Sequence, residues 1–321
     1  MLLLRGNRCQ DGVVPWRVAD PFRGLIRVSF AEVCFDAVSS MSVNPLVTAS
    51  WLASRIDDPG VVILDGTLPP VGVVPPVDTH ARYLAEHIPG AVFFDIEELS
   101  EQSTPLPHMM PTPEAFSRDM SALGVGDSMT IVVYEQEGVF SAPRVWWMLR
   151  TFGAKNVYLL DGGLRAWKAA GLPTQAGGVA RAPASFHARL NAEAVKNFAD
   201  VQKMIADRNQ ILDARSASRF NGTEQEPRPG TKAGHMPGSI NIHYSSLAKD
   251  GRFKSAEELR QLFGDKHVNL EQPMTTTCGS GITAAVLALG LEILGAKRVS
   301  LYDGSWAEYG SRPDAVIEKA D

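Results

Sequence analysis

The chain has 321 residues, of which 45% are hydrophobic and 21% are charged, and its mean hydropathy is −0.07. These values are typical of a globular protein of about two domains, and they argue against disorder, collagen and coiled coil. The formal charge of −5 provides no basic footprint, so nucleic acid is not expected as a partner.

Residues 1–40 differ from the rest of the chain because they carry five arginines and four acidic residues without helical periodicity. Arg5 interrupts the opening apolar run, which argues against a secretory signal, and the acidic residues argue against a mitochondrial presequence. No stretch of about 18 apolar residues occurs, so we expect a cytoplasmic protein without membrane association. Our hypothesis is that Met41 is the natural start and that residues 1–40 are a disordered extension or a start-site artefact.

Residues 41–176 are predicted to form a first domain in which short apolar strands alternate with helices. A capped helix is predicted at residues 48–55, and the aromatic stretch 144–151 is long enough for another. The predicted strands are residues 61–64, 130–134 and 156–160. Strands separated by helices of this length indicate βαβ units, and therefore a mostly parallel sheet with helices on both faces.

A segment rich in small residues and proline, residues 177–190, is predicted to link this domain to a second one at residues 191–321. The second domain repeats the same α/β pattern, with a helix predicted at residues 282–294. Its predicted strands are residues 210–213, 274–277 and 298–302.

An internal repeat relates the two halves. Residues 63–66 (ILDG) recur as residues 211–214 (ILDA), and residues 87–91 (HIPGA) recur as residues 235–239 (HMPGS), each 148 positions later. Matches beyond residue 150 are all spaced by 142 positions. Matches in one order with two constant spacings indicate two homologous domains of about 130 residues each.

Cys278 is the one cysteine outside residues 1–40, and it marks the predicted active site. It follows the predicted strand 274–277 and precedes a Gly-Ser-Gly loop and a helix, which is where open α/β sheets bind ligands. Two glycines let the loop turn its amides inward, so Cys278 is expected to be a thiolate; a buried structural cysteine is the alternative. The matching point of the first half, near Glu135 or Gln136, has no cysteine, so the second domain is predicted to be the catalytic one.

Cysteine phosphatases use a similar loop but place an arginine six positions after the cysteine. Ala284 stands there in this chain, which disfavours phosphate chemistry. From residue 41 onward the sequence resembles the two-domain rhodanese-like sulfurtransferases, in particular their 3-mercaptopyruvate branch. The motifs that carry the resemblance are residues 83–91 (YLAEHIPGA), 278–283 (CGSGIT) and 302–309 (YDGSWAEY).

The cysteine loop is similar to the CGSGVT loop of the mercaptopyruvate branch, with Ile282 in place of valine. Thiosulfate-preferring members usually place basic residues directly after the cysteine, where this chain has Gly279 and Ser280. The resemblance therefore implies tandem rhodanese-like domains that transfer sulfur from 3-mercaptopyruvate through a Cys278 persulfide and release pyruvate. The resemblance implies that no cofactor is needed. It also implies that the sulfur acceptor is cyanide or a thiol, and that the thiol belongs to a thioredoxin-like protein. The alternatives are a thiosulfate:cyanide sulfurtransferase and a non-catalytic sulfur carrier.

The resemblance also implies substrate-binding residues. A substrate carboxylate calls for the bidentate fork of arginine, and by motif position the two arginines are Arg219 and Arg228, with Arg215 as the nearest competitor. Ser280 is expected to hydrogen-bond the substrate carbonyl or to relay a proton to the leaving enolate. The remaining loop positions expected at the substrate are Gly279, Gly281, Ile282 and Thr283.

His87 and Asp78 are the residues that could orient the Ser280 hydroxyl across the domain interface, as the resemblance suggests. The alternative for His87 is a structural role, because its copy His235 stands in the same motif of the other domain. His80 and His87 are seven positions apart with no acidic or cysteine ligands around them, so no metal site is predicted. Met109 and its neighbour Met110, beside His108, are expected to pack between the domains.

Overall fold

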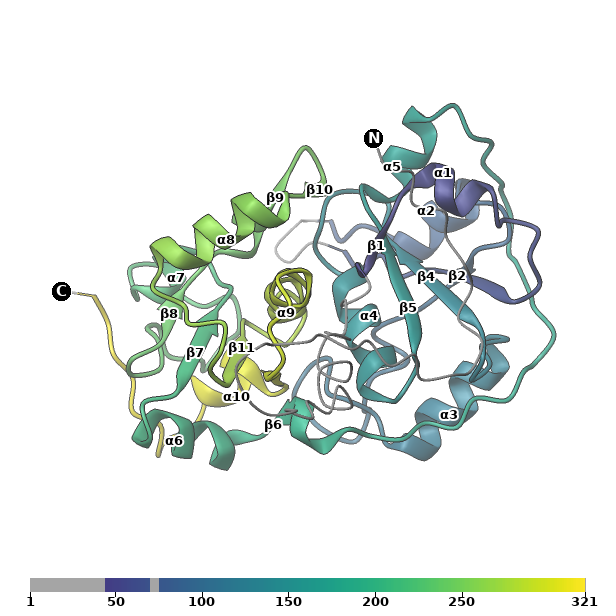
Figure 1. Cartoon of the computed structure of the whole chain (residues 1–321). Helices are drawn as coiled ribbons and strands as arrows, with labels where there is room; N and C mark the ends of the chain where they lie inside the picture. The colour runs from purple at the N-terminus through teal and green to yellow at the C-terminus, as the bar shows by residue number, and fades with distance from the viewer. Residues whose placement is uncertain (1–43, 70–74, 321) are drawn as a thin grey trace, which may run out of the picture. The chain divides into compact units, whose positions relative to one another are not determined.

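The computed structural model describes residues 44–69 and 75–320, so the expectations for residues 1–40 lie outside the described part of the chain. Both repeats belong to one compact unit. Each repeat is built around a five-stranded sheet in which all paired strands are parallel (Figure 1).

The two sheets have the same strand order. The first is β1 (Leu46–Val47), β5 (Asn156–Leu160), β4 (Thr130–Tyr134), β2 (Val61–Asp65) and β3 (Val92–Phe93). The second is β6 (Val195–Lys196), β12 (Val299–Tyr302), β11 (Met274–Thr277), β7 (Gln210–Asp213) and β8 (Ile240–Asn241). A separate antiparallel pair joins β9 (Ala248–Lys249) and β10 (Arg252–Phe253). The equal order means that the sequence repeat is a repeat of structure, element by element.

Helices occupy the segments between these strands. The first repeat contains α1 (Ala49–Ala53), α2 (Thr79–Ala85), α3 (Pro113–Ala122), α4 (Ala142–Thr151) and α5 (Gly163–Ala169). The second contains α6 (Phe198–Ala206), α7 (Ala217–Phe220), α8 (Ala256–Asp265), α9 (Ala284–Ile293) and α10 (Ser305–Tyr309). Short 3-10 turns, η2 (Ala192–Ala194) and η3 (Tyr244–Leu247), complete the second repeat.

Both faces of each sheet are covered, which confirms the predicted α/β class. In β2, Val61 and Ile63 belong to the cluster shared with α1 and α5, whereas Val62 and Leu64 belong to the cluster shared with α3 and α4. Side chains that alternate along a strand point to opposite faces. A strand whose residues are all buried is therefore a strand packed on both sides.

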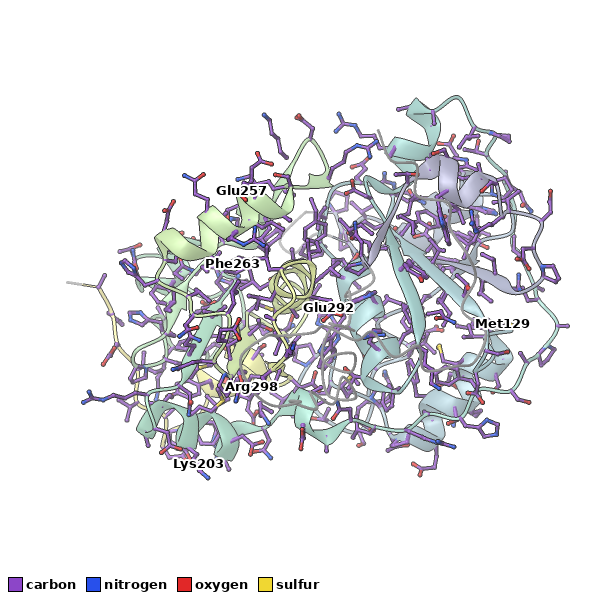
Figure 2. The ribbon with its side chains drawn as sticks, in the orientation of Figure 1. Met129, Lys203, Glu257, Phe263, Glu292 and Arg298 are labelled. Atoms are coloured by element: carbon purple, nitrogen blue, oxygen red, sulfur yellow. The ribbon has the colours of Figure 1, made fainter. Side chains whose placement is uncertain are left out.

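The two repeats meet along α4 and α9, which pack against each other. Residues 284–291 of α9 are all buried, as expected for a helix that is apolar on every side and enclosed by protein. Helix α8 covers α9 with one face only: Figure 2 shows Phe263 on its inner side and Glu257 on its outer side. Gly290 of α9 makes room for Leu247 of η3, since an added Cβ would lie 2.5 Å from the Leu247 Cδ2 atom.

Within residues 44–69 and 75–320, no helix combines the length and the apolarity that a membrane crossing requires.

Candidate active site

Cys278 lies at the carboxyl end of β11 and is only 2% exposed. The loop that follows curls sharply before α9 begins at Ala284. Gly281 has φ +82°, and a Cβ placed there would come within 3.0 Å of the Arg144 guanidinium and 3.1 Å of the Asp303 carbonyl. Glycine at this position is therefore required both by the backbone conformation and by the space.

The segment after β12 holds the first part of this loop in place. The Cys278 amide donates to the Ser305 hydroxyl at 3.2 Å, and the Cys278 carbonyl accepts from the Trp306 amide at 2.9 Å. The Gly279 carbonyl accepts from the Ala307 amide, also at 2.9 Å. Ser305 has φ +48°, a strained conformation for a residue with a side chain, which is held by these contacts. The sequence motif at residues 302–309 contains Ser305, but its role in holding the cysteine was not predicted.

The first repeat shows what such a loop binds. There the fully buried carboxylate of Glu135 accepts from the amides of Phe140 at 2.7 Å and Ser141 at 3.1 Å. Burial raises the pKa of Glu135 to about 7, although these hydrogen bonds act in the opposite direction. The same positions in the second repeat, 142 residues later, are Ile282 and Thr283.

Cys278 stands at the place of Glu135 in the second repeat, because its carbonyl accepts from the Trp306 amide as the Glu135 carbonyl accepts from the Leu164 amide. A cysteine, and not a carboxylic acid, therefore begins this loop. Among the described residues, no backbone carbonyl accepts from the Ile282 or Thr283 amide. The Ile282 side chain is buried in the core, and Thr283 occupies the N-cap position of α9 without a side-chain capping bond. Both residues therefore contribute through the backbone, in a loop whose counterpart in the first repeat binds a carboxyl group.

Ser280 is part of a hydrogen-bonded relay that crosses between the repeats. Its hydroxyl lies 3.0 Å from Nδ1 of His108, and Nε2 of His108 lies 2.9 Å from the Glu97 carboxylate. A carboxylate only accepts hydrogen bonds, so Nε2 carries the proton and Nδ1 of the neutral ring is left to accept from Ser280. The bond from His108 lowers the pKa of Glu97, which keeps this acid ionised.

The histidine beside Ser280 is thus His108, and the expected pair of His87 and Asp78 lies elsewhere. Nδ1 of His87 donates to the Tyr83 carbonyl at 2.7 Å, and Asp78 caps α2 by accepting from the Ala81 amide at 2.8 Å. His235 repeats the bond of His87, with Nδ1 2.8 Å from the Phe220 carbonyl. The shared motif therefore gives both histidines the same structural role.

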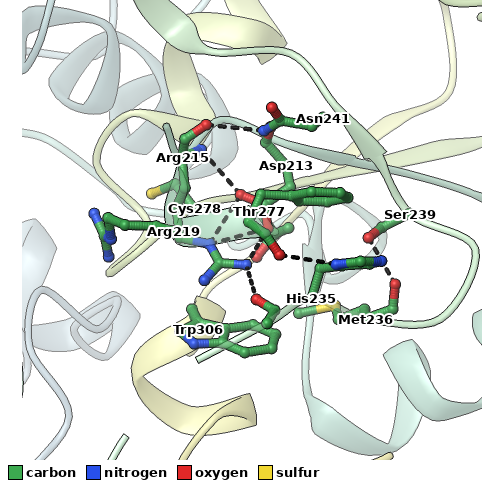
Figure 3. A network of polar contacts seen from close by, with 12 residues as sticks. Asp213, Arg215, Arg219, His235, Met236, Ser239, Asn241, Thr277, Cys278 and Trp306 are labelled. Atoms are coloured by element: carbon green, nitrogen blue, oxygen red, sulfur yellow. Dashed lines mark hydrogen bonds and ion pairs between the residues drawn. The ribbon is translucent and has the colours of Figure 1, made fainter. Parts of the chain in front are cut away.

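Arg219 lies against the cysteine loop. A Cβ added at Gly279 would lie 3.1 Å from its guanidinium, which explains why a glycine follows the cysteine. The Arg219 guanidinium forms an ion pair with the buried carboxylate of Glu226. Figure 3 shows Cys278 and Arg219 at the same edge of the polar network.

Arg215, the competing arginine, is a structural residue. It is 2% exposed, donates to Asp213 at 2.7 Å and reaches Glu226 at 2.7 Å. Its guanidinium also lies 4.0 Å from the ring centroid of the buried Trp306. Glu226 thus joins Arg215, fixed in the core, to Arg219 at the loop.

Arg228 is exposed, and its charge acts on the same site. Desolvation of its guanidinium lowers its pKa; Glu97 opposes this shift, and Arg219 adds to it. The structure thus brings the two predicted arginines together with the relay around the cysteine loop. In the part of the chain that the structure describes, no group of three His, Cys, Asp or Glu side chains is arranged to hold a metal ion.

Comparison with known proteins places this site in context. Residues 48–170 and 197–312 each match the rhodanese-like domain. The 3-mercaptopyruvate sulfurtransferase of Escherichia coli K12 is 44% identical over 279 residues, which are 87% of this chain and 99% of the relative. The human 3-mercaptopyruvate sulfurtransferase is 42% identical over 85% of this chain and 95% of its own length.

Among solved structures, that of SseA from Escherichia coli, described as a 3-mercaptopyruvate sulfotransferase with the rhodanese fold, is similar, with a TM-score of 0.76. The two are 43% identical, and the match covers 82% of this chain and 99% of that chain. The likeness spans both repeats.

Proposed function

The chain belongs to the family of rhodanese-like proteins, and from that premise we propose that it transfers sulfur from 3-mercaptopyruvate to a thiol or to cyanide. The observation that carries this proposal is the cysteine loop itself. Cys278 is followed by Gly279 and Ser280 instead of cationic residues, and Ser280 is joined to His108. A dianionic sulfur donor such as thiosulfate favours cations beside the sulfur, whereas a keto acid that leaves as an enolate needs a hydrogen-bond donor.

In the first step, the Cys278 thiolate attacks the sulfur of 3-mercaptopyruvate. A sulfur–sulfur bond forms, the carbon–sulfur bond breaks, and its electron pair passes to pyruvate as the enolate. The persulfide remains on Cys278 inside the amide loop. Arg219 and Arg228 bind the carboxylate and stabilise the negative charge that develops on the leaving group.

When the substrate binds, the Ser280 hydroxyl redirects its hydrogen bond from Nδ1 of His108 to the keto oxygen, which becomes the enolate oxygen as the carbon–sulfur bond breaks. His108 is aligned to return a proton to Ser280, because Glu97 stabilises the imidazolium form. The thiol proton of the substrate stays on the outer sulfur until the persulfide ionises and releases it. The enolate takes up one proton to become pyruvate, so the two proton transfers balance. A second thiolate, or cyanide, then removes the outer sulfur and regenerates the Cys278 thiolate.

A thioredoxin-like thiol acceptor remains a prediction from the family resemblance, and a cytoplasmic location remains a prediction from the sequence. The 2% exposure of Cys278 supports a small or extended acceptor group, because a flat protein surface cannot reach the sulfur.

The test compares 3-mercaptopyruvate and thiosulfate as donors, each with cyanide as acceptor, for the wild type and Cys278→Ser. We expect faster turnover of 3-mercaptopyruvate and loss of both activities in the variant. Faster turnover of thiosulfate would favour a thiosulfate:cyanide sulfurtransferase instead. Activity retained by Cys278→Ser would remove Cys278 as the nucleophile.

A further inference from the structure

We propose that the buried ion pair between Arg144 and Asp303 is a positioning device that sets His108 against Ser280 across the two repeats. This inference rests on the proton relay proposed above. The relay has a geometric difficulty, since Ser280 and His108 are 172 residues apart and belong to different repeats. A 3.0 Å hydrogen bond between them requires that the two loops keep a fixed separation.

Arg144 reaches from the first repeat into the active site of the second. It lies in α4, its side chain is fully buried, and its guanidinium is 4.8 Å from the ring centroid of Trp147. The guanidinium donates to the His108 carbonyl and to the Asp303 carboxylate at 2.8 Å. A longer contact of 3.4 Å reaches the Gly281 carbonyl in the cysteine loop.

Asp303 completes the device from the second repeat. While one of its oxygens accepts from Arg144, the other accepts from the amide of Met110 at 2.7 Å. The ion pair therefore forms two hydrogen bonds with the His108 segment, one with the His108 carbonyl and one with the Met110 amide. His108 itself has φ +56°, a conformation that a histidine adopts rarely and keeps only when its surroundings hold it.

Stability alone is a weak explanation for this pair. Moving two charges out of water is costly, and a buried ion pair is often no better for stability than apolar residues of the same volume. The other buried residues of α4 and α9 are mostly apolar. The charged groups contribute directional hydrogen bonds, which apolar residues cannot form. These bonds fix the His108 segment and the cysteine loop relative to the end of β12 at Asp303.

The inference is tested by a double-mutant cycle between Asp303→Asn and Ser280→Ala. An asparagine keeps the size of the side chain but has one acceptor oxygen, so either Arg144 or the Met110 amide loses its partner. We expect Asp303→Asn to lower kcat for 3-mercaptopyruvate about tenfold. In the Ser280→Ala background it should cause no further fall, because both changes act on the same relay.

Glu292→Gln is the matched control. The Arg150–Glu292 contact at 3.8 Å also joins α4 to α9, but both side chains are partly exposed. Its removal should leave kcat unchanged. Arg144→Lys, which keeps the charge and loses the fork, is the second variant if Asp303→Asn does not fold, and it should show the same dependence on Ser280.

Three results would overturn the proposal. Falls in kcat that add in the double variant would show that Asp303 does not act through Ser280. A folded Asp303→Asn protein with wild-type kcat would show that the pair positions nothing that the reaction needs. If Ser280→Ala alone left kcat unchanged, both the proposed relay and this inference would be wrong. Additive falls in kcat would contradict this inference only and would not contradict the relay.

Discussion

The two arginines at the cysteine loop differ in how firmly they are held. Arg219 is paired with Glu226, which is itself fixed by the buried Arg215, so its guanidinium is set before substrate arrives. Arg228 is exposed, and its pKa is lowered mainly by desolvation, with Arg219 acting in the same direction and Glu97 opposing it. In the proposed function, Arg219 therefore defines where the substrate carboxylate binds, and Arg228 adds a second positive charge.

Replacing Arg228 by alanine tests this division of roles. The change removes a charge-assisted hydrogen bond to the substrate carboxylate, worth about 1.5–3 kcal/mol, so KM for 3-mercaptopyruvate should rise roughly 10- to 100-fold. The fold should be unaffected, because Arg228 is exposed. Steady-state kinetics measure the change, with Arg260→Ala on the outer face of α8 as the control. An unchanged KM would remove Arg228 from the binding site.

At the scale of the element, the loop that follows β4 in the first repeat and the equivalent loop that follows β11 in the second repeat differ in function. In the first repeat, Glu135 fills the loop with a carboxylate and seals it. In the second repeat, Cys278 stands at the place of Glu135, as the matching hydrogen bonds from Leu164 to Glu135 and from Trp306 to Cys278 show. A duplicated strand–loop–helix element thus provides one structural copy and, in our proposal, one catalytic copy, and the two differ in the residue that directly follows the strand.

Glu135 makes the sealed loop sensitive to pH. Burial raises its pKa from 4.5 to about 7, and Asp65 acts in the same direction. The folded state therefore holds this proton more tightly than the unfolded state. The stabilising contribution is complete below pH 4.5 and is lost as the pH rises through about 7, by about 3 kcal/mol.

Urea unfolding of the wild type and of Glu135→Gln between these pH values measures this contribution. The wild type should lose stability relative to the variant as the pH rises, because the variant cannot titrate at this position. Glu137→Gln, at an exposed glutamate in the same loop, should show no such trend. A difference between wild type and Glu135→Gln that stays constant with pH would contradict the buried, protonated state of Glu135.

At the scale of the whole molecule, the sequence predicts what is local and repeated. The family, the parallel sheets and the strands 130–134, 156–160, 210–213 and 274–277 follow from apolar runs and from the constant spacing of the repeat, and the structure confirms them. The cysteine at a strand end was likewise visible in the sequence.

Contacts between the repeats were not predictable in this way. His108 stands in a proline-rich loop beside two methionines, with no periodic pattern that links it to Ser280. The family resemblance offered His87 as a possible assisting residue, with a structural role as the alternative, and the structure gives its motif a structural role in both repeats. Glu97, Arg144 and Asp303 gain their roles only when α4 and α9 bring the two repeats together.

The central claim is that Cys278 carries the transferred sulfur, and one measurement tests it directly. The protein is incubated with 3-mercaptopyruvate in the absence of an acceptor, and the mass of its peptides and the amount of pyruvate are determined. We predict a gain of one sulfur atom on the peptide that contains Cys278, with an equal amount of pyruvate, and neither in Cys278→Ser. Sulfur on a different residue, or pyruvate released without a gain of sulfur at Cys278, would contradict the account.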